Sequence, residues 1–179
     1  MLAYLFIVMA LAVHIRWIAL PFSFTPVLAA LLYFGARMPR KQMWAPLALL
    51  AASDLYLNRV VYNYPFRADQ VATWAFYAAV LLLGATAIKG WSAARIGGSA
   101  LGASVGFFLV SNFAVWASGT MYPKTMSGLM TCYAAGVPFF RRGLAGDMLF
   151  TAVMFGLPAL AAAISHSTHK SQGQGTAAA

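Results

Sequence analysis

The residues best able to do chemistry in this chain are polar side chains set inside long apolar segments. Asn112 lies within the apolar segment 96–118, and Trp116 follows one helical turn later. A polar group at membrane depth is costly unless it meets a partner or a cavity. Asn112 can therefore contact a ligand, or it can hydrogen-bond to another helix as a structural contact. The sequence leaves both interpretations open.

Charged residues stand at the ends of two other apolar segments. Asp54 follows an apolar run, with Asn58 one turn later, and a salt bridge and a ligand contact are equally open for it. Asp147 lies in the first turn of the last apolar segment, shortly after Arg141 and Arg142. The helix dipole favours an acid near a helix start, so Asp147 can also be a capping charge paired with one of these arginines.

The chain offers little material for catalysis. It has three acidic residues and three histidines, and two of these, His166 and His169, lie in the C-terminal tail. Cys132 is the single cysteine and cannot form an internal disulfide. We find no nucleophile–base pair, no metal-ligand motif and no phosphate-binding loop. The sequence therefore predicts a protein that is not an enzyme and that carries neither a cofactor nor a metal.

Composition predicts an integral membrane protein. The chain is 62% hydrophobic and only 8% charged, whereas a soluble domain carries about 25% charged residues. Its formal net charge is +9, but the lysines and arginines are spread between apolar segments rather than clustered. Such spacing is typical of charges that flank a membrane. We therefore expect the lipid bilayer as a partner and no nucleic acid.

Apolar segments divide the chain into an all-α bundle of about six transmembrane helices, because a span needs about 20 apolar residues. A short interfacial or re-entrant helix, residues 125–135, is expected before the last span. Residues 1–164 would form one transmembrane domain, and the polar tail 165–179 is expected to be disordered. The predicted spans are residues 2–20, 24–36, 43–57, 71–88, 96–118 and 144–164.

Short basic loops suggest the orientation in the membrane. Positive charges in the loops 37–42 and 89–95 favour a cytoplasmic location for these loops and for both termini of a multi-pass inner-membrane protein. The polar residues named above would then meet near the outer face, together with Tyr122. Polar groups that converge in an apolar concavity are typical of a small-molecule site.

The segment 96–118 also begins with a ladder of small residues at four-residue spacing. Its members are Ala94, Gly98, Gly102 and Gly106. Small residues at this spacing allow another helix to approach closely. We therefore predict a helix-packing face over the first turns of this segment.

Several motifs carry a resemblance to a known family. Ser53-Asp54-Leu55, the run from Ser111 to Trp116, Met121-Tyr122-Pro123 and Pro138-Phe139-Phe140 resemble an uncharacterised family of small bacterial membrane proteins. In layout that family is similar to the substrate-binding S components of energy-coupling-factor vitamin importers. The resemblance implies a six-helix bundle that captures a vitamin-like nutrient from outside and docks to a coupling subunit with its ATPases.

Two functions remain as hypotheses. The first is a membrane substrate-binding or transport protein, in which the arginines neutralise an anionic group of the ligand. The second is a structural or assembly subunit whose small-residue ladder contacts its partner. The residues predicted to bind the substrate are Asp54, Asn58, Asn112, Trp116, Tyr122, Arg141, Arg142 and Asp147.

Overall fold

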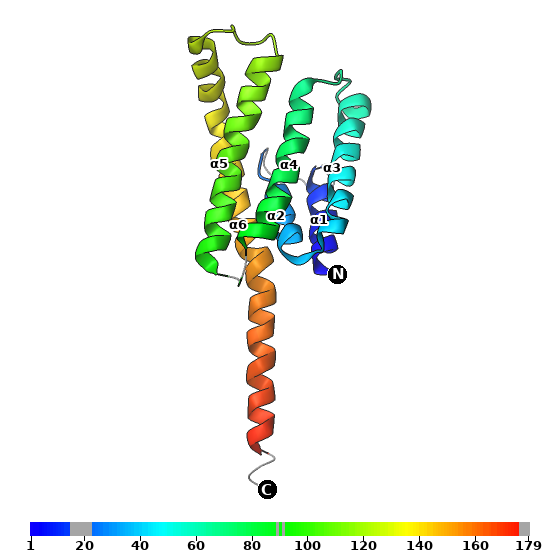
Figure 1. The fold of residues 1–179 in the computed structure, drawn as a ribbon, viewed down its shortest axis with the longest axis vertical. Coiled ribbons are helices and arrows are strands. Elements are labelled where there is room, and N and C mark those ends of the chain that lie inside the picture. The colour runs from blue at the N-terminus through cyan, green and yellow to red at the C-terminus, as the bar shows by residue number, and fades with distance from the viewer. Residues whose placement is uncertain (15–22, 89, 91, 176–179) are drawn as a thin grey trace.

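The computed structural model describes residues 1–14, 23–88, 90 and 92–175, with side chains up to residue 164. The regular secondary structure in these ranges is helical, without a strand. Consecutive α-helices run in alternating directions (Figure 1). The helices are α1 (Leu2–His14), α2 (Val27–Arg37), the short η1 (Arg40–Gln42), α3 (Trp44–Tyr56) with its π-helical extension η2 (Leu57–Val61), α4 (Ala68–Ala87), α5 (Ala93–Ser118) and α6 (Met126–Gly175).

Helix α2 forms the centre of the bundle. It contacts α1, α4, α5 and α6. Every residue from Val27 to Gly35 is buried, and Leu31, Leu32 and Phe34 have no exposed surface. A helix that is apolar on all sides needs an apolar environment on all sides. Here protein supplies that environment, so α2 is stable although it is too short to cross a bilayer.

Two glycines bring α2 and α4 into direct backbone contact. A Cβ atom added to Gly35 would lie 2.1 Å from the carbonyl oxygen of Leu81, and one added to Gly84 would lie 2.3 Å from that of Leu32. Only glycine fits at either position, because any side chain would overlap the backbone of the other helix. At this pair the backbones of two helices touch directly.

The small-residue ladder on α5 lies on a different face from the one that packs. In the described chain nothing lies within 4 Å of a Cβ added to Gly98 or Gly102, and Ala94 is exposed. Gly106 does pack, against the ring of Phe76 on α4. The buried residues near the start of α5 are instead Ser99, Ala100, Ala103 and Ser104. Close packing along the whole ladder is therefore not found among the described residues, since the helix turns its neighbouring face to α4 and α6.

Three helices are long and apolar enough to cross a membrane. They are α4, α5 and the part of α6 from Met126 to Ile164. The expectation of six spans is not supported, because α1, α2 and α3 have 11 to 13 residues each. At 1.5 Å per residue α1 and α2 measure roughly 16 to 20 Å, well short of the hydrocarbon core of about 30 Å, and α3 comes closer to that thickness only through the five residues of η2. The part of the first predicted span beyond residue 14 falls in 15–22, outside the described residues.

Helix α6 replaces two elements that the sequence separated. The expected short helix 125–135 and last span 144–164 are one continuous helix, which passes through Pro138 and Pro158 and extends into the tail as far as Gly175. A proline costs about 3 kcal/mol inside a helix, but contacts of its neighbours with α5 can offset this. The hydroxyl of Tyr133 donates a 2.8 Å hydrogen bond to the carbonyl of Leu109 there. Figure 1 shows the C-terminal half of α6 projecting away from the bundle.

Candidate functional site

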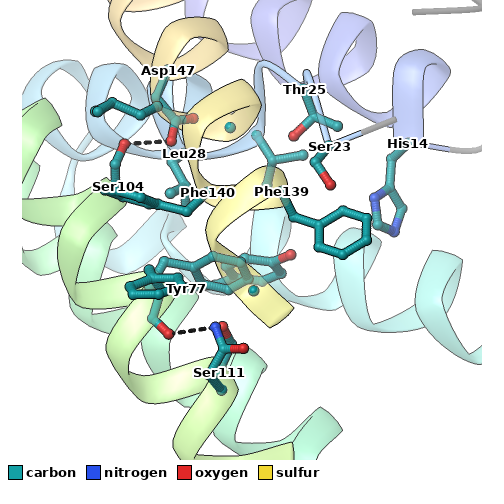
Figure 2. Close-up of a pocket in the computed structure, with 17 residues that line it drawn as sticks. His14, Ser23, Thr25, Leu28, Tyr77, Ser104, Ser111, Phe139, Phe140 and Asp147 are labelled. Carbon is teal, nitrogen blue, oxygen red and sulfur yellow. Dashed lines mark hydrogen bonds between the residues drawn. The ribbon is translucent and has the colours of Figure 1, made fainter. Parts of the chain in front are cut away.

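A cavity of about 300 Å³ lies among the end of α1, the segment before α2, and helices α2, α4, α5 and α6. Figure 2 shows hydroxyl, imidazole and carboxyl side chains from these elements around it, with aromatic rings between them. The polar lining consists of His14, Ser23, Thr25, Tyr77, Ser104, Ser111, Asn112 and Asp147. The remaining lining residues are Val27, Leu28, Phe107, Phe108, Gly136, Phe139, Phe140, Gly143 and Leu144.

Asp147 supplies the carboxylate of this cavity. It is 6% exposed, and it accepts a hydrogen bond from the hydroxyl of Ser104 on α5. Neither arginine that the sequence suggested as its partner is bonded to it among the described contacts. Ser111, also on α5, lies far from Asp147 in the view of Figure 2. The tertiary fold, rather than the dipole at a helix start, therefore determines the surroundings of Asp147, which lies well inside α6.

Asp54 belongs to a separate polar cluster at the edge of the cavity. Its two carboxylate oxygens are bonded to Nε2 of His14 and to the indole N–H of Trp74, each at 2.7 Å. His14 lines the cavity, whereas Asp54 and Trp74 do not. The cluster joins α1, α3 and α4, and it satisfies both oxygens of this half-buried acid. Asp54 therefore orients His14 rather than facing the cavity itself.

Asn112 lines the cavity, and a glycine on the next helix makes room for it. Its side-chain amide donates a 2.8 Å hydrogen bond to the carbonyl of Phe108, one turn earlier on α5. A Cβ atom added to Gly136 of α6 would lie 2.5 Å from the side-chain oxygen of Asn112. The thiol of Cys132 reaches the backbone carbonyl of Asn112 at 3.4 Å. The side chain of Asn112 thus meets α6 through a steric contact at Gly136, with its oxygen directed toward α6 at the cavity wall.

Aromatic rings form much of the cavity wall. Phe107 stacks on Tyr77 of α4, with ring centroids 6.1 Å apart and planes inclined by 13°. Phe108 lies against Phe140 of α6, with centroids 4.7 Å apart. These contacts fix the rings from three helices in place before any ligand binds.

Trp116 lies in the last turn of α5 and Tyr122 in the connection to α6, and neither lines the cavity. The indole N–H of Trp116 donates to the carbonyl of Pro123 at 2.9 Å. Lys124 lies 5.4 Å above the Trp116 ring and donates hydrogen bonds to the carbonyls of Trp116 and Gly119. Unpaired carbonyls at a helix C-terminus favour such a cation. These residues therefore close the end of α5.

The other predicted binding residues are also placed elsewhere. Arg141 and Arg142 are exposed, and they line a second, more open hollow with Phe24, Pro138 and Ala145. Asn58 lies in η2, where its backbone carbonyl accepts a 2.7 Å hydrogen bond from the N–H of Tyr64. Of the eight residues predicted from the sequence, only Asn112 and Asp147 line the cavity.

Several lining residues were not among the predicted site residues. His14 carried a usable signal, because an ionisable ring at membrane depth is rare. Tyr77 and the four phenylalanines carried none, since aromatic residues are common throughout such a chain. Ser104 was hidden in the small-residue stretch at the start of α5. Its role depends on a contact with a residue 43 positions away.

Comparison with known proteins gives a family for the chain. Residues 1–170 match DUF6580, a family of unknown function. The chain belongs to this family. No curated protein and no solved structure matches it. Membership of DUF6580 is consistent with the uncharacterised family expected from the sequence, and it assigns no activity.

Proposed function

We propose that this DUF6580 protein binds a small, nutrient-like molecule in the cavity between α2, α4, α5 and α6, and that it does so as part of membrane transport. The observation that carries the proposal is the cavity itself. Polar groups from separate elements converge there inside an otherwise apolar bundle. Small-molecule sites are typically apolar concavities with a few well-placed polar groups.

Burial of the polar groups of the cavity costs free energy, which a functional role for these groups would explain. Asp147 and Ser104 are buried between helices that are long and apolar enough to span a membrane. Hydrophobic residues of similar size would serve a purely structural core at least as well. One cavity is lined by a carboxylate, an imidazole and four hydroxyl groups of serine and threonine. Their presence together therefore supports a binding role.

The proposed setting is the cytoplasmic membrane of a bacterial cell. We propose that α4, α5 and α6 cross it and that both termini are cytoplasmic, which requires that α1 to α3, packed within the bundle, together bring the chain from the inner side to the outer start of α4. The basic loops 37–42 and 89–95 support this orientation, since positive charge is enriched on the inner side. In analogy to the S components, delivery across the membrane would use a coupling subunit and ATPases.

A thermal-shift screen on the purified protein tests the proposal. Vitamin-like and related nutrients are added in detergent solution, and the unfolding temperature is measured. A ligand at about 100 times its Kd raises the free energy of unfolding by roughly 2.7 kcal/mol. For a chain of this size, the unfolding temperature then rises by roughly 5–11 °C. The cavity variant Ser111→Leu should lose this response. Val110→Leu, on the exposed face beside it, should keep it.

Two results contradict the proposal. One is a complete screen in which no compound stabilises the native sequence. The other is stabilisation that persists unchanged in Ser111→Leu, because the ligand would then bind outside the cavity.

An assembly role is the second candidate, and one observation favours it. Gly98 and Gly102 leave an open strip on α5 with nothing within 4 Å in the described chain. A helix of a partner protein can approach closely at such a strip. Under this function Gly102→Leu abolishes copurification of the partner, and Ser111→Leu has no effect on it.

A further inference from the structure

We infer that the cavity selects an organic cation, meaning an amine or quaternary ammonium group on a small apolar body, with Asp147 as its counter-charge. The inference rests on the proposed binding function and names the charge class of the ligand. It replaces the anionic ligand that Arg141 and Arg142 suggested from sequence. Three observations carry it: the unmatched carboxylate, the charge of the lining, and the aromatic walls.

Asp147 is the acid whose charge remains unmatched by the described residues. The chain has only three acidic residues. Asp69 is paired with Arg67 at 3.0 Å, and Asp54 is bonded to both His14 and Trp74. For Asp147 the described contacts comprise one hydroxyl, that of Ser104. A carboxylate accepts about four hydrogen bonds, so Asp147 keeps most of its capacity for a group inside the cavity.

The described lining contains no lysine or arginine. His14 is its one basic residue, and the carboxylate of Asp54 already faces that ring. Arg141 and Arg142 line the other hollow, and Lys124 is bonded to the end of α5. A carboxylate without a nearby cation repels an anionic ligand and attracts a cationic one. The electrostatics of the described lining therefore favour positive charge.

The aromatic walls favour an organic cation over a metal ion. Five rings line the cavity, those of Tyr77, Phe107, Phe108, Phe139 and Phe140. Ring faces attract ammonium groups and also contact the apolar body that carries them. A metal ion needs several ligand atoms at short distance, and no group of three His, Cys, Asp or Glu side chains comes together in the described ranges.

Three probes of the same size class test the inference. Phenyltrimethylammonium carries the positive charge, tert-butylbenzene has nearly the same shape without charge, and benzoate is the anionic counterpart. Binding of each to the purified full-length protein in detergent is measured by thermal shift and by calorimetry. Sodium chloride at equal ionic strength controls for salt. We expect the cation to bind, and the other two to bind at least tenfold more weakly.

Matched variants assign the effect to the proposed residues. Asp147→Asn removes the charge at constant shape and should weaken binding of the cation roughly 30-fold or more. Asp69→Asn is the same chemical change at an acid outside the cavity, and it should leave binding unchanged. Phe140→Leu should weaken binding of the cation roughly 2- to 30-fold through the lost ring face, with much less effect on binding of tert-butylbenzene. The Phe140→Leu variant keeps the test informative if Asp147→Asn does not fold.

The outcomes separate the inference from the proposed function. Equal binding of the cation and tert-butylbenzene, or equal binding of the cation to Asp147→Asn and the native sequence, overturns the organic-cation assignment. Preferred binding of benzoate or of a screened anion, lost in Ser111→Leu, overturns it while the binding function stands. Failure of the three probes together with the whole nutrient screen removes both.

Discussion

Substitution of Gly35 by alanine should destabilise the bundle through a single added methyl group. The new Cβ would lie 2.1 Å from the carbonyl oxygen of Leu81 and 3.2 Å from the amide nitrogen of Ala85. Both atoms are backbone, so no side chain can rotate away to relieve the overlap. Helices α2 and α4 would have to separate by about 1 Å to restore an ordinary contact.

The magnitude follows from what surrounds the contact. Overpacking in a well-packed core costs about 1–3 kcal/mol, and more where the backbone must move. Because α2 is also packed against α1 and α6, its displacement disturbs the opposite faces as well. For a chain of this length we expect the unfolding temperature to fall by roughly 2–12 °C.

The assay is thermal unfolding in a mild detergent, followed by the fluorescence of the five tryptophans. Gly98→Ala is the matched control, since Gly98 is also helical but a Cβ there meets nothing within 4 Å. Alanine should raise helix stability at that position by up to about 1 kcal/mol. Equal unfolding temperatures for Gly35→Ala and Gly98→Ala would refute the close contact between α2 and α4.

Two further predictions concern the polar contacts around the cavity. Trp74→Phe keeps a ring but loses the 2.7 Å hydrogen bond to Asp54. The free energy of unfolding should fall by roughly 1.5–3 kcal/mol, which is the contribution of a hydrogen bond to a charged group. A double-mutant cycle with Asp54→Asn should show strong coupling in denaturant titrations. Gly136→Ala should destabilise by overlap with the Asn112 side chain, which lies 2.5 Å from the added atom. Asn112→Ala in the same chain should restore much of the lost stability, and strictly additive effects in thermal unfolding would contradict this contact.

Secondary structure was predicted well where hydrophobic length alone decides it. The segments around α4 and α5 were expected at residues 71–88 and 96–118, and the structure has them at Ala68–Ala87 and Ala93–Ser118. The expectation failed at α6, because Pro138 and the glycines near it are usual signs of a helix end. Packing along α5 keeps that helix continuous instead.

Helix–helix contacts were harder to predict than helices. The regular spacing of Gly98 and Gly102 suggested a packing face, whereas the close contact falls at Gly35 and Gly84, single glycines without such a ladder. Periodicity tells which residues share a face of a helix. It does not tell which of several faces turns toward a neighbour, since that depends on how all the helices pack together.

The sequence by itself determined that this is a helical protein of membrane-like composition with very few acidic side chains. It also placed Asn112 and Asp147 among eight candidate binding residues, and both line the cavity. Only the tertiary structure decided which acid keeps its charge unmatched among the described residues. Asp54 finds His14 at a separation of 40 residues, and Asp147 finds Ser104 at 43. The chain order carries no information about such pairings, because they arise when helices distant in sequence pack side by side.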